Sequence, residues 1–415
     1  MENIKRLLEN ARSAAKDAAR LSDIQTAGLL KTLQKMLLEE TEGICTANNL
    51  DVTAMKPGDP KTDRLILNET RIADIAQSLL DIAALPTPAG TLISETRAKN
   101  GLLIQKKSVP LGVVGVIYES RPNVTIDVAA LCIRSGNACL LRGGTDAAHT
   151  NDFLVSLIRK AIRESGYNPD IVQILPTDRK HVTEMLEATK FIDIIIPRGS
   201  QELISFVRKN SLVPTIETGA GVCHTYIEKT ADLKKAAAIV VNAKVSRPSV
   251  CNALDTIIVD RGILKIFLEN VYAGLQKHNV EIFADSESYV VLNAMNYQGL
   301  NHAAPEDFGR EFLDFKCSIK VVDGFDEALA HIAEFSSRHS EAIISENTTL
   351  CERFLNETDA AAVYVNASTR FTDGGVFGLG AEIGISTQKL HARGPFALEK
   401  LVTEKWIVRG NGQVR

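Results

Sequence analysis

The chain has 415 residues, more than one hydrophobic core usually serves, so we expect two or three domains. A formal net charge of −4 gives no reason to expect nucleic acid or a membrane as partner. The seven cysteines include no Cys-x-x-Cys pair, which disfavours a disulfide framework and a metal site. Apolar runs are shorter than a bilayer span and the N-terminus does not resemble a signal peptide, so we expect a cytoplasmic protein.

The N-terminal part of the chain has the composition and periodicity of helices. Apolar residues at helical spacing predict helices over 3–19, 22–40 and 68–84. The cluster Pro57-Gly58-Asp59-Pro60 predicts a loop between them. This part carries no group that indicates chemistry, so we expect it to pack on a larger body.

A hairpin is predicted over 93–107. Asn100-Gly101 separates two strand-like runs, and Asn-Gly is a strong signal for a tight β-turn. The tail 404–409 is also strand-like. Hairpin and tail together are consistent with an oligomerisation flap that joins subunits, and equally with an ordinary hairpin at a sheet edge.

The remainder alternates between strands and helices, which predicts an α/β fold with parallel sheets covered on both faces. We expect a cofactor-binding domain over 1–230, a catalytic domain over 231–370, and a segment 371–415 that returns to the first domain and ends in the tail. Predicted strands are 112–118, 138–141, 171–175, 191–196, 254–259, 319–322, 342–344 and 361–365. Predicted helices are 124–133, 145–163, 179–188, 201–209, 233–241, 263–277, 326–334 and 348–355.

Cys251 lies in a predicted loop, between a helix that Asp232 can cap and an Ile/Val-rich strand. Lys244 and Arg247 are nearby in sequence, and positive charge favours the nucleophilic thiolate. The alternative is a small buried thiol that only packs. The two interpretations are about evenly balanced from these residues alone.

Three strand-to-helix turns are candidate ligand sites, because parallel sheets bind ligands at the carboxyl ends of their strands. Gly199 and Ser200 open a helix whose first amides can face an anion. Arg142 can hold a phosphate, or lie in solvent beside a capped helix. Asn123 can cap its helix or donate to a developing oxyanion. Glu217, beside two glycines, is a possible base or a structural carboxylate.

The order of these motifs resembles the aldehyde dehydrogenase superfamily over nearly the whole chain. That fold has two parallel-sheet α/β domains and an oligomerisation flap made of a β-hairpin and the tail. The motifs that carry the resemblance are the turn with Asn123, the stretch Gly136-Asn137-Ala138-Cys139-Leu140-Leu141-Arg142, Gly199-Ser200, Glu217-Thr218-Gly219, Cys251 and the late glycines.

The resemblance implies roles for these residues. Cys251 would be the nucleophile and Asn123 an oxyanion donor. Glu217 matches the residue that serves hydrolytic relatives as general base. The residues implied to bind the cofactor, NADPH/NADP, are Arg142, Gly199, Ser200 and Glu311.

The chain departs from hydrolytic members at Pro122, which replaces the usual Trp, and at Ser249-Val250 before the nucleophile. These departures agree with a branch that reduces an acyl phosphate through a Cys251 thioester. Arg121 and Arg247 are the substrate-binding candidates, with salt bridges to local carboxylates as the alternative.

The implied partners are a small-molecule substrate, the kinase that makes it, and further copies of the chain. Two other functional classes stay open: an acylating aldehyde dehydrogenase that uses coenzyme A, and a non-catalytic binding protein on the same fold.

Overall fold

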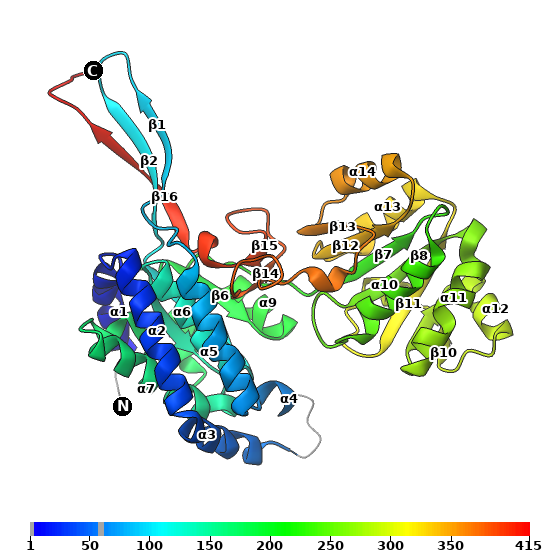
Figure 1. Ribbon diagram of the computed structural model, residues 1–415, viewed down its shortest axis with the longest axis horizontal. Helices are drawn as coiled ribbons and strands as arrows, with labels where there is room; N and C mark the ends of the chain where they lie inside the picture. Colours follow the sequence, from blue (N-terminus) through cyan, green and yellow to red (C-terminus); the bar gives the residue numbers. More distant parts are fainter. Residues whose placement is uncertain (1–3, 57–61) are drawn as a thin grey trace. The chain divides into compact units, whose positions relative to one another are not determined.

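The structure is a computed structural model that describes residues 4–56 and 62–415; the loop predicted at 57–60 lies outside this range. The chain divides into two compact units (Figure 1). The first comprises Met1–Thr218, Gly378–Gly384 and Pro395–Arg415, and the second Gly219–Phe377 and Ile385–Gly394. In the part of the chain described, no helix is long and apolar enough to cross a membrane.

The first unit begins with helices, as predicted. Ser22 caps α2 in a capping box with Gln25, and α2 runs alongside α5 (Figure 1). Two helices, α3 and the single turn α4, were not predicted. The buried face of α3 includes the polar residues Asn48 and Asp51 and so lacks an apolar stripe. The bounds are α1 Ile4–Ala18, α2 Asp23–Glu39, α3 Thr41–Ala54, α4 Thr62–Leu65 and α5 Glu69–Ala84.

The centre of the first unit is a parallel sheet with strand order β5-β4-β3-β6. Every residue of β3 is buried, as expected for a strand covered on both faces. The bounds are β3 Val113–Tyr118, α6 Pro122–Arg134, β4 Ala138–Arg142, α7 Ala148–Glu164, β5 Val172–Ile174, α8 Lys180–Leu186, β6 Ile194–Arg198 and α9 Gln201–Asn210. The loops after β3, β4 and β6 therefore meet at one edge of this sheet.

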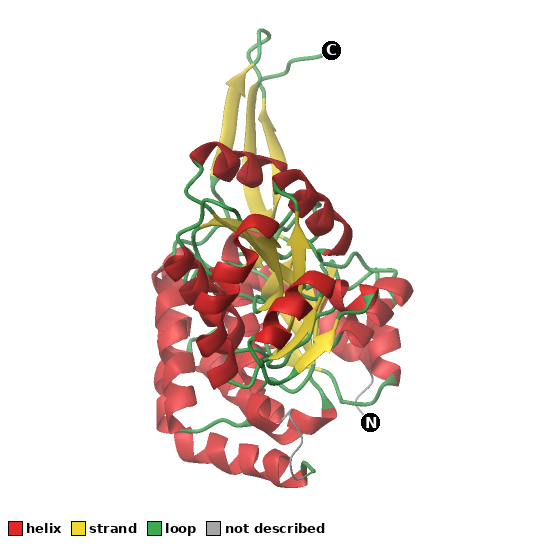
Figure 2. Cartoon of the chain, turned by 90° about the vertical axis from the view of Figure 1, so that its right-hand side faces the viewer, coloured by secondary structure: helices red, strands yellow, loops and turns green. Residues whose placement is uncertain are grey.

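The predicted hairpin is confirmed. Strands β1 (Leu92–Arg97) and β2 (Leu103–Pro110) pair antiparallel, and Gly101 in the turn has a φ of +88°. The tail strand β16 (Val402–Arg409) adds to the other side of β2, with Trp406 opposite Lys106. Figures 1 and 2 show these three strands extending away from the helices of their own unit.

The second unit contains a parallel sheet with strand order β10-β9-β11-β8-β7-β12-β13. One face packs on α10, α11 and α12, and the other on α13 and α14. The bounds are β7 Cys223–Ile227, α10 Leu233–Val245, β8 Leu254–Asp260, α11 Leu264–Lys277, β9 Glu281–Ala284, α12 Ser286–Ala294, β10 Leu300–His302, β11 Lys316–Val322, α13 Phe325–Phe335, β12 Ser340–Ile344, α14 Thr348–Glu357 and β13 Ala362–Val365. Two short strands, β14 Gly384–Ser386 and β15 Gly394–Phe396, pair near the end of the chain.

The boundaries expected at 230 and 370 need correction. Strand β7, which was not predicted, pairs with β8 and β12, so the chain enters the second unit at Gly219. The second unit extends as far as Phe377 and also includes Ile385–Gly394. The end of the chain, Pro395–Arg415, belongs to the first unit.

Candidate active site

Cys251 lies in the second unit on the loop between α10 and β8, where it is partly exposed. Asp232 caps α10 by accepting from the amides of Lys234 and Lys235, at 3.0 and 3.1 Å. The loop is thus held by a capped helix on one side and a fully buried strand on the other. This setting suits a nucleophile, because ordered elements flank a cysteine that is partly exposed.

The backbone of Cys251 is packed against two neighbours. Cys223 Sγ donates to the Cys251 carbonyl at 3.2 Å, and burial raises the pKa of Cys223 well above its ordinary range, so this second thiol stays protonated. Gly221 approaches so closely that a Cβ there would overlap the Cys251 carbonyl. Only glycine fits at residue 221 without moving the loop.

Glu311 belongs to the same neighbourhood. Its Oε1 accepts the Gly221 amide at 2.9 Å, so the carboxylate is tied to the segment that supports Cys251. The role expected for Glu311 rests on the resemblance alone, and its hydrogen bond to Gly221 places it beside the segment that packs on Cys251.

Lys244, which we considered as a cationic neighbour of the thiolate, has a different setting. Its side chain is fully buried, and Nζ donates to the carbonyls of Asp314 and Lys316 at 3.1 and 2.8 Å. It also pairs with Asp255 at 3.6 Å. Lys244 therefore joins α10 to β11 and the segment before it.

Arg370 is a cation near Cys251 that the sequence did not single out. Its Nε donates to Ser246 Oγ at 3.1 Å, and its Nη1 donates to Asn252 Oδ1. Arg247 is exposed, and its charge and that of Cys251 both act on Arg370. No sequence signal marks Arg370, since it lies in a short turn, Thr369–Phe371, far along the chain.

In the first unit, Asn123 lies inside α6 and does not cap it. Pro122 occupies the first helical position and Arg121 the cap position, so the capping interpretation is wrong. Asn123 Nδ2 instead donates to Asp127 Oδ2 one turn later, at 3.1 Å. Burial raises the pKa of Asp127 to about 6, against the opposing effects of the Asn123 hydrogen bond and the Arg198 charge.

The turn at Gly199 and Ser200 already faces a carboxylate. The Ser200 amide donates to Glu119 Oε2 at 2.8 Å, and Ser200 Oγ caps α9 by accepting from Leu203 N at 3.3 Å. A negative group at the start of α9 is what a helix N-terminus favours. The turn can therefore bind an anion, and in this structure the Glu119 carboxylate occupies that position.

Arg142 does not lie in solvent, as the alternative interpretation required. The residue is 9% exposed, and its Nη2 donates to the Thr177 carbonyl at 2.6 Å. Its Nε has no hydrogen-bond partner among the described residues. Burial lowers the pKa of Arg142, and the charge of the exposed Arg179 lowers it further. The charges of Glu119, Asp146 and Asp178 oppose this shift, so cations and carboxylates both act on Arg142.

Glu217 and Arg121 also lie in the first unit. Glu217 Oε2 is 3.8 Å from Arg208 Nη1 of α9, and the Glu217 side chain is 18% exposed. Arg121 is partly buried and precedes α6 directly. The predicted residues therefore fall into two groups, Asn123, Arg121, Arg142, Gly199, Ser200 and Glu217 in the first unit, and Cys251, Arg247 and Glu311 in the second.

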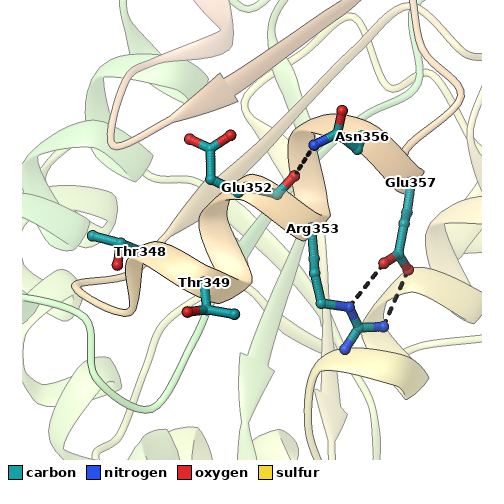
Figure 3. Close-up of a pocket in the computed structure, with 6 residues that line it drawn as sticks. All are labelled: Thr348, Thr349, Glu352, Arg353, Asn356 and Glu357. Atoms are coloured by element: carbon teal, nitrogen blue, oxygen red, sulfur yellow. Dashed lines mark hydrogen bonds and ion pairs between the residues drawn. The ribbon is translucent and has the colours of Figure 1, made fainter.

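A separate hollow lies on the surface of α14 (Figure 3). Arg353 in it pairs with Glu357 at 2.8 Å and with Asp326 at 3.1 Å, so its charges are compensated by neighbours. None of the candidate residues lines it; the lining is Thr348, Thr349, Glu352, Arg353, Asn356 and Glu357.

Comparison with known proteins places the chain in a family. The model of the aldehyde dehydrogenase family matches residues 1–298. The chain is 49% identical over 415 residues to a gamma-glutamyl phosphate reductase from Chlorobium phaeobacteroides, covering 100% of this chain and 99% of that one. It is 52% identical over 396 residues to the enzyme of that name from Legionella pneumophila, covering 95% and 94%.

Solved structures agree. The crystal structure of a gamma-glutamyl phosphate reductase from Thermotoga maritima matches with a TM-score of 0.94 and 40% identity, covering 100% of both chains. An acetylating aldehyde dehydrogenase from Geobacillus thermoglucosidasius has the same fold, with a TM-score of 0.73, 16% identity and full coverage of both chains. The chain belongs to the aldehyde dehydrogenase family and, within it, groups with the gamma-glutamyl phosphate reductases.

Proposed function

We propose that the chain reduces L-glutamyl 5-phosphate to L-glutamate 5-semialdehyde and phosphate, a step of proline biosynthesis. The observation that carries this proposal is full-length identity of about half to reductases of that name, together with a partly exposed Cys251 on a rigid loop. A non-catalytic binding protein is disfavoured, because Gly221 and Glu311 hold the segment around the cysteine as a catalytic site requires.

Cys251 acts as the nucleophile. Its thiolate attacks the acyl carbon, the carbon–oxygen bond to phosphate breaks, and phosphate leaves with the electron pair. The carbonyl oxygen becomes an oxyanion for which Asn123 Nδ2 and the Cys251 amide are the donors. The product is a thioester on Cys251. After reduction, the thiohemiacetal collapses to the aldehyde and the free thiolate.

Glu217 is not the general base of this reaction. A base that activates water would hydrolyse the thioester, which a reductase must preserve. The ion pair with Arg208 of α9, at 3.8 Å, supports a Glu217 carboxylate that is held in place and does not activate water. Arg121 and Arg247 are proposed to bind the charged groups of the substrate.

The cofactor is proposed to be NADPH, which supplies the hydride. The residues fit such a group: the buried Arg142 Nε lacks a partner among the described residues, and Arg179 lies close by. These cations suit the 2′-phosphate that distinguishes NADPH from NADH. The α9 N-terminus at Gly199 and Ser200 is the proposed site of the pyrophosphate, which would take the place of the Glu119 carboxylate. Glu311 is the proposed ligand of the nicotinamide ribose.

A second copy of the chain is the proposed partner of the three-stranded sheet, which would make the enzyme a homo-oligomer. Strand β1 is exposed along its whole length, and Leu92, Ile93, Trp406 and Val408 are all about half exposed. Exposed apolar residues on both edge strands of this sheet favour pairing. Trp406→Glu should lower the mass measured by light scattering, and an unchanged mass would refute this assignment.

The enzyme is proposed to act in the cytoplasm, where its seven free thiols stay reduced. Because an acyl phosphate is short-lived in water, a functional link to a glutamate 5-kinase that makes the substrate is also proposed. Co-purification of the two enzymes would show this link, as would a coupled reaction that is faster when both enzymes are mixed than diffusion of the free acyl phosphate allows. A coupled rate limited by free diffusion would contradict the link.

Detection of the thioester on Cys251 is the direct test of this mechanism. Wild type mixed with the semialdehyde and NADP⁺ without phosphate should form about one equivalent of NADPH per subunit and an acyl adduct on Cys251. Adding phosphate should remove the adduct and restart turnover. An adduct that coenzyme A discharges and phosphate does not would identify an acylating aldehyde dehydrogenase.

A further inference from the structure

We propose that Arg370, together with Arg247, forms the site for the phosphate group that leaves during acylation of Cys251. The proposal rests on the function proposed above and deepens it, because it names the residues that receive the leaving group. It adds a residue, Arg370, that neither the motif order nor the resemblance singles out.

Arg370 forms hydrogen bonds to the loop between α10 and β8 (the nucleophile loop), at residues on both sides of Cys251. Its guanidinium donates to Ser246 before the cysteine and to Asn252 directly after it. The attachment is reciprocal, since Asn252 Nδ2 donates to the Thr372 carbonyl at 2.9 Å and Thr369 Oγ1 donates to the Asn252 carbonyl at 2.8 Å. The turn that carries Arg370 and the residue after Cys251 therefore form one hydrogen-bonded unit.

No direct ion pair neutralises the positive charge of Arg247 and Arg370 in the part of the chain that the structure describes. Neither Arg247 nor Arg370 forms an ion pair with a carboxylate among the residues the structure describes. Burial lowers the pKa of Arg370 and the charge of Arg247 lowers it further. The charges of Cys251, Asp373 and Cys223 oppose this shift. An arginine stays protonated throughout, so two like charges lie together beside the nucleophile. Such an arrangement is stable when an anion joins it.

The position of the pair selects the phosphate over the other anionic group of the substrate. Sulfur attack and phosphate departure occur at the same carbon, so the leaving oxygen lies beside Cys251. The α-carboxylate is separated from that carbon by the rest of the side chain. Charge-assisted hydrogen bonds from a guanidinium stabilise the departing dianion. In the reverse direction they hold inorganic phosphate while its oxygen attacks the thioester carbon and the carbon–sulfur bond breaks.

The test measures the reverse reaction with Arg370→Gln, with Arg353→Gln on α14 as the matched control. The KM for inorganic phosphate should rise by about 10–100-fold in Arg370→Gln, the loss expected for a charged hydrogen bond, with the KM for the semialdehyde nearly unchanged. Arg247→Gln should raise the KM for inorganic phosphate by a smaller factor. In Arg370→Lys this KM should lie between those of wild type and Arg370→Gln. The control should match wild type.

Two kinetic outcomes overturn the proposal. A rise confined to the KM for the semialdehyde would assign the pair to the α-carboxylate. Unchanged constants for both substrates would mean that Arg370 only supports the loop. If Arg370→Gln does not fold, Arg247→Gln carries the same comparison, because its side chain is exposed.

A second readout does not depend on turnover. Inorganic phosphate should slow the alkylation of Cys251 by iodoacetamide in wild type and in Arg353→Gln, and much less in Arg370→Gln. Wild type without phosphate-dependent turnover but with this protection would refute the proposed function and keep the phosphate site. Turnover in wild type without protection would refute the site alone.

Discussion

Asn123 Nδ2 donates a hydrogen bond to Asp127 Oδ2 across one turn of α6, at 3.1 Å, and Ser78 Oγ of α5 approaches the other carboxylate oxygen at 3.5 Å. A primary amide has two hydrogens, and Asp127 accepts one of them. The second hydrogen remains for another acceptor. Because Asn123 is the oxyanion donor of the proposed mechanism, we propose Asp127 as the residue that orients it.

Asn123→Ala should lower kcat by about 100- to 1,000-fold, the usual loss for one oxyanion donor. Asp127→Ala should lower kcat less, by roughly tenfold, with little change in KM, because the amide is still present but is no longer oriented. Steady-state kinetics at saturating cofactor would separate the two effects. Equal KM and kcat changes in Asp127→Ala would indicate a general structural defect, and Asp127→Asn, which keeps an acceptor, should recover most of the rate.

The raised pKa of Asp127 predicts a pH-dependent stability. The pKa is about 6 in the folded chain and 3.8 in its ordinary state, so the unfolded chain loses the proton first as the pH rises. The stabilising effect of the neutral carboxyl is present below pH 4 and is lost as the pH rises through 6. Between pH 4 and 7 the stability of Asp127→Asn relative to wild type should increase by about 1–3 kcal/mol, as measured by denaturant unfolding. If the unfolding stabilities of wild type and Asp127→Asn vary with pH in parallel, the pKa of Asp127 is not raised in the folded chain.

Gly221→Ala should inactivate the enzyme, because the added methyl group overlaps the Cys251 carbonyl and must displace the loop. Gly28→Ala is the matched control. A Cβ at Gly28 meets nothing within 4 Å, and alanine in helix α2 should raise stability by about 0.5–1 kcal/mol. Activity and thermal unfolding of the two variants would be compared. A fully active Gly221→Ala would show that the loop around Cys251 is not rigid.

Arg142→Ala should raise the KM for NADPH by about 10–100-fold and leave the KM for NADH nearly unchanged, because only NADPH has a 2′-phosphate. Arg179→Ala should act in the same direction with a smaller factor, since Arg179 is exposed. Both constants come from initial rates. If Arg142→Ala weakens both cofactors equally, the buried guanidinium serves the fold through its bond to Thr177.

The nucleophile loop could be predicted from local signals. Asp232 caps α10 and an Ile/Val-rich run forms β8. The capping residue and the strand pattern therefore predicted that Cys251 lies on the loop between a helix and a strand. The same kind of signal failed at Asn123, because the helix begins at Pro122, two residues earlier than predicted, and the asparagine lies inside it. Strand β7 was missed because Cys223, His224 and Thr225 interrupt its apolar pattern.

Contacts between distant residues could not be predicted. Arg370 and Asn252 are 118 positions apart, and no periodicity links them. The same holds for Glu311, which meets Gly221 across 90 positions. In both cases the two residues are far apart in sequence, and only the tertiary fold of the second unit brings them into contact.

The most direct measurement is the formation of NADPH from L-glutamate 5-semialdehyde and NADP⁺, with and without inorganic phosphate, in wild type and in Cys251→Ala. Acyl transfer through Cys251 predicts sustained NADPH formation that requires phosphate and is absent in the variant. Sustained formation without phosphate would mean that water discharges the thioester. That result would make the enzyme a hydrolytic dehydrogenase and return Glu217 to the role of general base.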